Sequence, residues 1–290
     1  MKTVTLPLRL QRELELLRSQ GKTIGFVPTM GALHDGHLEL VRRSKRENDI
    51  TVVSIFVNPT QFGPHEDFNR YPRLVQKDKQ LLRRAGVDYL LLPTVSGMYP
   101  AGDSLFVSMD SANSAAAVTT MYCGKSRPGH YRGVLTVCAK LFNIVRPGRV
   151  YMGAKDYQQT VVIERLIEEL HLGIKLVRVP TVREADGLAL SSRNRYLSAS
   201  GRVRARMISQ TLFSARAALR QGKKPFKTVL RAARVQLARH VDQVDYLEAV
   251  DAATLRPLSK SQKNMVLLTA CYVGKTRLID NVTIRTAKKK

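Results

Sequence analysis

The sequence has few cysteines, few acidic residues and no long hydrophobic run, and each shortage excludes a class of protein. Its three cysteines, Cys123, Cys138 and Cys271, are odd in number and far apart. This argues against a disulfide framework or a metal knuckle and fits a reducing compartment. No apolar run approaches the length of a membrane span, and residues 1–20 alternate charged and apolar side chains instead of forming a signal-peptide core. We therefore expect a cytoplasmic protein with no membrane segment.

Acidic residues are outnumbered by basic ones, 23 to 48, which gives a formal net charge of +25. The excess is concentrated in residues 201–290, where 20 basic and 5 acidic residues give +15. Residues 202–239 contain eleven basic residues and no acid. Such a field attracts polyanions such as nucleic acid, but it also suits a solvated face that aids solubility or steers anionic substrates. We favour the solvated face, so nucleic acid is not expected as a partner, although the charge leaves it open.

Hydrophobic patterning predicts an α/β fold. The chain has 290 residues, of which 44% are hydrophobic, enough for a large core and two domains. Strand-like runs occur at residues 23–27, 51–57, 88–92, 149–153 and 174–179. Helical patterns between them cover residues 38–46, 74–85, 134–145 and 157–170. Because strands that alternate with helices form parallel sheets, ligands are expected at the carboxyl ends of the strands.

The pattern changes after about residue 182. Two helices are predicted at residues 201–221 and 226–240, followed by strands at 244–250, 265–273 and 276–284. We predict two domains: a parallel-sheet domain over residues 1–181 and a smaller α+β C-terminal domain over residues 182–290.

The segment from Pro28 to His37, PTMGALHDGH, is predicted to handle phosphate. It follows a buried strand and leads into an amphipathic helix that begins near residues 35–37, so unpaired helix N–H groups and the positive dipole end would face an anion. His34 and His37 stand beside that terminus as donors. A His-x-x-His pair is also compatible with half of a metal site or with chance. Zinc is disfavoured because no cysteine or third histidine lies nearby.

Four later turns, like the segment 28–37, carry polar residues at predicted strand ends or helix starts. Asn58 and Gln61 follow an apolar strand with two uncharged carboxamides, although Asn-Pro is also ordinary turn chemistry. His130 lies in an Arg-rich Pro-Gly bend that suits carboxylate or phosphate but is also compatible with a surface turn. Lys155, in a Gly-Ala-Lys-Asp turn, could neutralise phosphate; alternatively Asp156 is a simple helix cap.

The last of these turns lies where the two predicted domains meet. Residues 183–194 combine a glycine turn with Ser191, Ser192 and Arg193, a set that could close on a triphosphate. An interdomain linker is the alternative, but a linker does not need so many hydrogen-bonding groups in sequence.

Taken together, the segments PTMGALHDGH, FVNPTQF, YPR, RPGHY, KDYQQ and PTVREADGLALSSRNRYLS resemble the pantothenate synthetase (pantoate–β-alanine ligase) family. That family belongs to the nucleotidyl transferases whose HxGH turn is shared with class I aminoacyl-tRNA synthetases, and the SSRN segment takes the place of their KMSKS loop. The resemblance implies a Rossmann-like ATP domain, a small C-terminal lid domain and a homodimer.

The implied reaction is a two-step ligation that depends on Mg²⁺ and ATP. The pantoate carboxylate attacks the α-phosphate of ATP and pyrophosphate leaves. The β-alanine amine then attacks the pantoyl adenylate, which gives pantothenate and AMP. Pantoate, β-alanine and ATP are therefore the expected small-molecule partners.

Site residues carry over from the family by motif. His37, as proton donor, and His34, Lys155 and Arg193 are implied in catalysis, since fixed cationic donors stabilise charge that grows on phosphate. Pantoate and β-alanine would contact Gln61, Gln159, Asn58 and His130. The Mg²⁺ ligands are not identified. The residues implied in ATP binding are Met30, Gly31, Ala32, Leu33, His34, Asp35, Gly36, His37, Gly153, Ala154, Lys155, Asp156, Val182, Leu190, Ser191, Ser192 and Arg193.

The chain departs from the family pattern at three positions: Cys123 and Gly148 replace common acidic residues, and Ala154 replaces a common glutamate. None is implied in the chemistry itself. Two alternatives stay open, another HxGH nucleotidyl transferase with a different acid substrate and a basic nucleic-acid-binding protein on the same fold. The carboxamides Asn58, Gln61 and Gln159 favour the pantoate-type acid.

Overall fold

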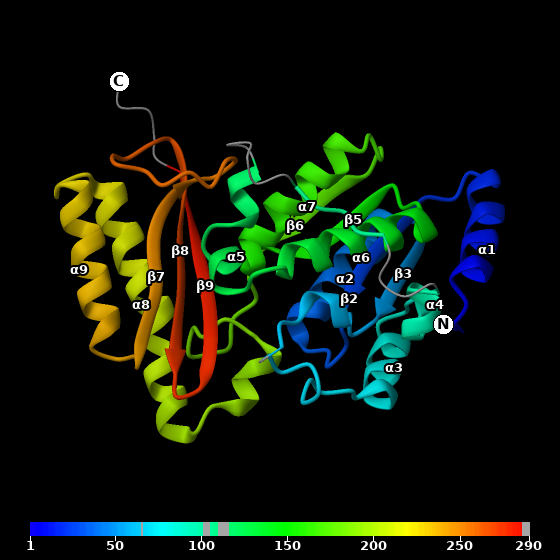
Figure 1. Ribbon diagram of the computed structural model, residues 1–290, viewed down its shortest axis with the longest axis horizontal. Helices are drawn as coiled ribbons and strands as arrows, with labels where there is room; N and C mark the ends of the chain where they lie inside the picture. Colours follow the sequence, from blue (N-terminus) through cyan, green and yellow to red (C-terminus); the bar gives the residue numbers. More distant parts are fainter. Residues whose placement is uncertain (65, 101–104, 110–115, 286–290) are drawn as a thin grey trace. The chain divides into compact units, whose positions relative to one another are not determined.

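The chain folds into two compact units in the computed structural model, which describes residues 1–64, 66–100, 105–109 and 116–285 (Figure 1). Unit 1 comprises Met1–Ala154 and Gln159–Pro180, and unit 2 comprises Lys155–Gln158 and Thr181–Lys290. The short segment Lys155–Gln158 thus groups with the C-terminal unit, which the predicted boundary after residue 181 does not anticipate. The functional roles assigned to the two predicted domains stay predictions.

Unit 1 contains a six-stranded sheet in the order β1-β4-β3-β2-β5-β6, in which every pairing is parallel. This confirms the predicted α/β parallel sheet. The strand β1 was not among the predicted elements. The strands are β1 (Lys2–Val4), β2 (Ile24–Thr29), β3 (Ile50–Ile55), β4 (Tyr89–Leu91), β5 (Arg149–Gly153) and β6 (Lys175–Val179).

The strand order reverses at β2. From β2 the chain proceeds to β3 and β4 on one side, and it returns to place β5 and β6 on the other. In open parallel sheets ligands bind at such a switch point, outside the carboxyl ends of the strands. The segments that follow β2 and β5 are therefore the first places to look for a site.

Helices cover both faces of this sheet. Phe26 meets Phe142 of α6 edge-on, with ring centroids 6.4 Å apart. The next residue, Val27, points to the opposite face because strand side chains alternate, and there it joins a buried cluster with Val41 of α2 and Leu82 of α3. The helices of this part are α1 (Pro7–Ser19), α2 (Asp35–Glu47), α3 (Val75–Arg84), α4 (Val95–Met98), α5 (Cys123–Ser126), α6 (His130–Val145) and α7 (Tyr157–Glu169), with short 3-10 turns η1 (Pro59–Gln61), η2 (Ala116–Thr119) and η3 (Ala154–Asp156).

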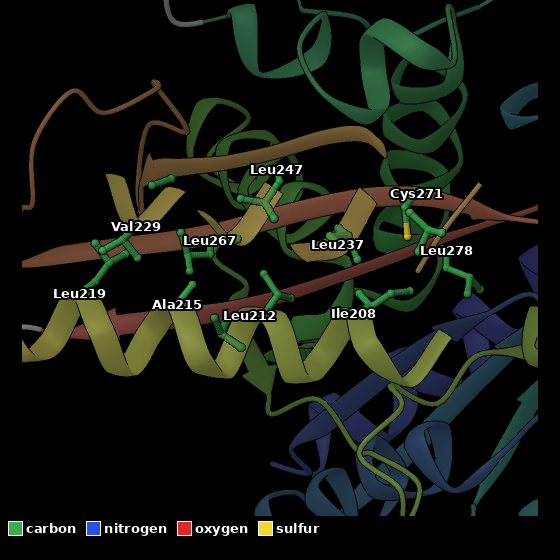
Figure 2. Close-up of a cluster of buried hydrophobic side chains, with 14 of the residues drawn as sticks. Ile208, Leu212, Ala215, Leu219, Val229, Leu237, Leu247, Leu267, Cys271 and Leu278 are labelled. Carbon is green, nitrogen blue, oxygen red and sulfur yellow. The ribbon is translucent and has the colours of Figure 1, made fainter. Parts of the chain in front are cut away.

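Unit 2 packs two helices against a three-stranded antiparallel sheet with the order β7-β8-β9. Ile208, Leu212, Ala215 and Leu219 form one stripe of the long helix and meet apolar side chains of the strands (Figure 2). This confirms the predicted smaller α+β domain. Its elements are η4 (Ser192–Tyr196), α8 (Ala199–Gln221), α9 (Phe226–Ala238), β7 (Gln243–Asp251), β8 (Asn264–Val273) and β9 (Thr276–Arg285).

All three cysteines are free and buried. Burial raises the pKa of the Cys138 thiol to about 12 and that of Cys271 to about 12. Because a thiol reacts as its thiolate, these two side chains behave as small apolar core residues near neutral pH. Within the described part of the chain, no helix is both long enough and apolar enough to cross a membrane.

Candidate active site

The turn after β2 has a backbone that only a few residue types adopt. Gly31 has φ +84° and Ala32 has φ 52°, both in the left-handed region. Two amides of this turn, Ala32 N and Leu33 N, donate to the carboxylate of Asp78 over 2.8 and 2.9 Å. A Cβ on Gly31 would lie 3.0 Å from that carboxylate. Because Gly31 has no side chain, the buried carboxylate of Asp78 can approach the turn closely enough to bind its amides.

Asp78, which holds the turn expected to bind ATP, was not among the predicted site residues. It is 1% exposed and lies on α3, 45 residues or more from the amides it accepts from. One signal was available: Asp78 precedes Leu82 by four residues, which places an acid on the buried stripe of a predicted helix. A buried carboxylate needs hydrogen-bond donors, and here two backbone amides supply them.

Helix α2 begins at Asp35, as predicted, and both histidines cap it. The Nδ1 atom of His34 accepts from Gly36 N over 3.2 Å, and the Nδ1 atom of His37 accepts from His34 N over 3.4 Å. The ring centroids are 4.1 Å apart. A neutral imidazole that accepts at Nδ1 carries its proton on Nε2. Each ring can therefore serve the helix with one nitrogen and donate to an anion with the other.

Three of the four predicted acid-binding residues, Asn58, Gln61 and His130, form one hydrogen-bonded group with Met30 of the turn after β2. Asn58, Gln61 and His130 are all buried, and the Nε2 amide of Gln61 donates to Met30 Sδ over 3.1 Å. The Nδ2 amide of Asn58 donates to Gln61 Oε1 over 3.2 Å. The turn after β3 and the turn after β2 are thus in direct contact, as neighbouring strands of a parallel sheet require.

Arg127 holds His130 in place. Its guanidinium pairs with Glu66, with Nε 2.8 Å from Oε1, and its Nη1 lies 3.1 Å from His130 Nε2. A guanidinium can only donate, so His130 Nε2 accepts and its Nδ1 carries the proton that binds Gln61 O at 2.9 Å. Glu66 and Arg127 were not among the predicted site residues. Arg127 acts on the backbone of Gln61 through His130 and also directly, because its Nη2 donates to Gln61 O over 3.4 Å.

The turn after β5 is tied to unit 2. Lys155 is half-buried, and its carbonyl oxygen accepts from Asn281 Nδ2 of β9 over 2.7 Å. Tyr157 OH donates to Ala252 O over 2.9 Å. These two bonds explain why Lys155–Gln158 groups with the C-terminal unit. Gln159 follows in the first turns of α7 and belongs to unit 1.

The segment 182–194 is closely hydrogen-bonded within unit 2. Leu190 N donates to Val182 O over 3.0 Å, and Ser191 Oγ accepts from Arg193 N over 3.2 Å, which caps the turn η4. Asn194 Nδ2 donates to Glu184 Oε1 over 2.8 Å. The Arg202 guanidinium that binds Glu184 holds the pKa of that carboxyl below its ordinary value.

Most predicted site residues fall into two groups, one in each unit, while Gly153–Asp156 and Gln159 lie apart from both in the turn after β5 and the start of α7. Unit 1 brings together Met30–His37 with Asn58, Gln61 and His130, while unit 2 brings Val182 and Leu190 together beside Ser191–Arg193. The three departures from the family pattern lie outside these contacts: Cys123 is buried in α5, Gly148 precedes β5, and Ala154 opens η3. Among the described residues, no group of three or more His, Cys, Asp or Glu side chains is placed to hold a metal ion.

Comparison with known proteins agrees with this geometry. The profile of the pantoate-beta-alanine ligase family matches residues 2–283. A pantothenate synthetase from Sulfurihydrogenibium sp. (strain YO3AOP1) is 48% identical over 284 residues, which cover 97% of this chain and 99% of that relative. One from Moorella thermoacetica is 47% identical over 92% of this chain and 93% of its own length.

Solved structures are similar over the same length. The crystal structure of pantothenate synthetase from Thermus thermophilus gives a TM-score of 0.91 at 44% identity, with 97% of this chain and 99% of that chain covered. The pantoate-beta-alanine ligase from Francisella tularensis, complexed with beta-gamma ATP and beta-alanine, gives 0.76 at 34% identity, with 97% of each chain covered.

Proposed function

The chain belongs to the pantoate–β-alanine ligase family, and on that premise we propose how its residues carry out the ATP-dependent joining of pantoate to β-alanine. The observation that carries the proposal is the contact between Gln61 and Met30, 3.1 Å apart. It joins the residues expected to hold the acid to the turn expected to hold ATP. Both substrates therefore meet at the switch point of one sheet.

In unit 1, the ATP-binding residues are Met30–His37. The first amides of α2 and the positive end of its dipole face the phosphates, and His34 and His37 donate from Nε2. As the proton donor in adenylate formation, His37 acts from its imidazolium form, in which Nδ1 also carries a proton and no longer accepts from His34 N; the proton goes to the leaving pyrophosphate. Negative charge increases on the phosphoryl oxygens and on departing pyrophosphate, so these donors stabilise the transition state more than the ground state.

In unit 2, the ATP-binding residues are Lys155, Asp156, Val182 and Leu190–Arg193. Gly153 and Ala154, the last residues of unit 1 before Lys155, also bind ATP. Lys155 and Arg193 are cations and neutralise phosphate charge as it develops. The bond from Asn281 to the Lys155 carbonyl, 2.7 Å, fixes the backbone from which the lysine side chain reaches.

Gln61, Gln159, Asn58 and His130 bind the acid substrate. Carboxamides orient the hydroxyl and carboxylate of pantoate without a competing charge. A pantoate carboxylate oxygen attacks the α-phosphorus of ATP in line, and the bond to pyrophosphate breaks. The β-alanine nitrogen then attacks the carbonyl carbon of the adenylate, AMP leaves with the C–O electron pair, and the amine loses a proton. Positioning supplies much of the acceleration, because no enzyme nucleophile takes part.

Mg²⁺ enters as part of the substrate, bound to the ATP phosphates. We further propose a cytoplasmic homodimer that acts on these small molecules without a nucleic-acid partner. Light scattering of the purified chain checks the dimer.

Pantoate-dependent ATP–pyrophosphate exchange tests the proposed function. We expect exchange with ATP and pantoate alone, and AMP release only after β-alanine is added. Exchange with another carboxylic acid but not with pantoate would indicate a different nucleotidyl transferase. Exchange with pantoate but no AMP release on addition of β-alanine would contradict the second-substrate assignment.

A further inference from the structure

The side-chain amide of Asn58 has a single orientation that satisfies its neighbours. Its Oδ1 accepts from Tyr99 OH over 2.8 Å and from Thr60 Oγ1 over 3.1 Å. Its Nδ2 donates to the backbone carbonyl of Gly133 over 3.2 Å. A carbonyl has no proton to give, so the nitrogen end must face Gly133. Asn58 is 1% exposed, and reversal of its amide would set two acceptors against each other.

The orientation of the Asn58 amide also fixes the orientation of the Gln61 amide. The second proton of Asn58 Nδ2 is directed to Gln61 Oε1 over 3.2 Å, so the oxygen of Gln61 is occupied as an acceptor. The nitrogen of Gln61 lies on the Met30 side, 3.1 Å from a thioether sulfur, which is only a weak acceptor. Gln61 therefore presents an N–H donor beside the turn after β2, where the carboxylate and hydroxyl oxygens of an acid substrate would accept it.

The backbone of Gln61 is fixed by an independent set of contacts. Its carbonyl oxygen accepts from His130 Nδ1 over 2.9 Å, and Arg127 and Glu66 hold that imidazole. Position and amide orientation are thus determined separately: His130 fixes where the residue lies, and Asn58 fixes which end of the amide points outward.

The close approach of α6 makes this arrangement possible. A Cβ on Gly133 would lie 2.3 Å from Thr60 O and 2.6 Å from Gln61 Cα. A side chain at position 133 would push the turn η1 away from the helix and lengthen the bond from Asn58 to the Gly133 carbonyl. Tyr99, which is 6% exposed, is held at the other end of the same network.

We propose that Tyr99 and Gly133 are positioning residues that fix the amide of Gln61 with its nitrogen outward, so that Gln61 donates a hydrogen bond to the acid substrate. The inference rests on the proposed role of Gln61 in binding pantoate. Tyr99 acts on Gln61 through Asn58, Gly133 acts through Asn58 and by letting α6 approach Gln61 closely, and neither needs to touch the substrate.

Tyr99→Phe tests the proposal, because it removes one hydroxyl and keeps the ring. We expect the KM for pantoate in the exchange reaction to rise about tenfold, the effect of one lost orienting hydrogen bond, while the KM for ATP stays unchanged. In a Gln61→Ala background, Tyr99→Phe should have no further effect on the pantoate KM, since the residue through which it acts is gone.

Tyr151→Phe is the matched control. Tyr151 is also buried and its hydroxyl also has two partners, Asn48 at 2.7 Å and Glu47 at 3.0 Å, and both lie outside the network around Asn58. We expect a lower Tm with an unchanged pantoate KM. An equal rise in the pantoate KM for the two tyrosine variants would overturn the proposal that Tyr99 acts on Gln61 through Asn58. An unchanged pantoate KM in Tyr99→Phe would overturn it too.

Gln61→Glu distinguishes a donor from an acceptor at the same place. If the nitrogen of Gln61 donates to pantoate, an ionised carboxyl there repels the substrate, and the pantoate KM should fall again as the pH is lowered and that carboxyl is protonated. If Gln61→Ala and Gln61→Glu both leave the pantoate KM unchanged, the proposed role of Gln61 fails. If the two Gln61 variants raise the pantoate KM and Tyr99→Phe does not, Gln61 keeps its proposed role and only the positioning role of Tyr99 fails.

Discussion

At the scale of single residues, the proposed site contains side chains that accept hydrogen bonds from backbone amides. His34 and His37 accept from amides at the start of α2 with Nδ1, which leaves Nε2 as the protonated nitrogen. A helix N-terminus alone attracts an anion by its dipole. With imidazoles as caps, the same terminus also gains N–H donors for the charge that develops on a leaving group, and an imidazolium form can pass a proton to that group.

His37→Ala should reduce pantoate-dependent exchange by about 10²–10⁴-fold, the usual contribution of a positioned proton donor. Loss of its cap bond should lower the free energy of unfolding by only about 1 kcal/mol. Exchange kinetics and urea unfolding measure the two effects separately. His37→Asn is the control for the cap, since it keeps a side-chain acceptor but not a titratable donor. Full exchange in His37→Ala would contradict the proton-donor role.

Asp78→Asn should raise the KM for ATP and lower the free energy of unfolding by about 1–3 kcal/mol. The carboxylate accepts from two amides of the turn after β2, and an amide at this place would set an NH₂ group against one of them. Asp49→Asn, at an exposed acid that accepts from Thr23, is the control and should leave the KM for ATP unchanged. An Asp78→Asn enzyme with normal ATP affinity would show that the acid is only structural.

At the scale of elements, helix α6 and strand β9 hold the predicted segments in place. Gly133 brings α6 against η1, and Asn281 ties the backbone of Lys155 to β9. The loop between residues 183 and 202 is held by Glu184, which binds both Asn194 and Arg202. Short recognition segments are therefore kept in place by regular elements distant in sequence.

Asn281→Asp should raise the KM for ATP about tenfold with little effect on the KM for pantoate. The substitution keeps the side-chain shape but places a carboxylate against the Lys155 carbonyl, two acceptors that repel. Asn264→Asp, an exposed position on β8, is the matched control. Equal changes in the two Michaelis constants would point to a general loss of structure instead.

The contact between Glu184 and Arg202 should make the loop sensitive to acid. The pKa of Glu184 is lowered by the Arg202 guanidinium, so its stabilising effect is present above the ordinary value of 4.5 and is lost as the pH falls through the lowered folded value. The stability difference between the native chain and Glu184→Gln should therefore be largest near neutral pH and shrink in acid. Urea unfolding over a pH series measures this, and a difference that grows in acid would contradict it.

At the scale of the whole molecule, the net charge of +25 includes many basic residues that have no proposed part in the reaction. Lys227, Arg231 and Arg234 are exposed on α9, while Val229, Ala233 and Leu237 of the same helix face the core of unit 2. The spacing of these cations follows from amphipathicity alone, because the polar side of a helix repeats with the same period as its apolar side. This favours a solvated basic face.

Replacing Lys227, Arg231 and Arg234 together by glutamate should leave ligation rates within about twofold at moderate salt, since screening is strong beyond a Debye length of roughly 8 Å. A fluorescent RNA duplex titrated against the native chain should show only weak binding that disappears at physiological salt. Tight RNA binding with a steep salt dependence, lost in the triple variant, would support the nucleic-acid alternative.

The sequence by itself determined that helices cover a parallel sheet and that a turn able to bind an anion, in residues 28–37, joins the first predicted strand to the helix that follows it. Fully apolar runs that alternate with amphipathic ones require a buried parallel sheet, and the glycines and histidines of residues 28–37 specify a turn before a helix, as found. The strand β1 was missed because Lys2–Val4 contains a single apolar residue and so forms no apolar run, and its pairing with β4 defines it.

Only the tertiary structure decided which side chains hold the site. Asp78 meets the turn after β2 from 45 residues away, Tyr99 meets Asn58 from 41, and Asn281 meets Lys155 from 126. Sequence patterns encode what is buried and where the chain turns, because those depend on neighbours three or four positions away. The partner of a buried polar group depends on which elements pack together, so the orientation of Gln61 and the grouping of Lys155 with unit 2 emerge only when the chain is folded.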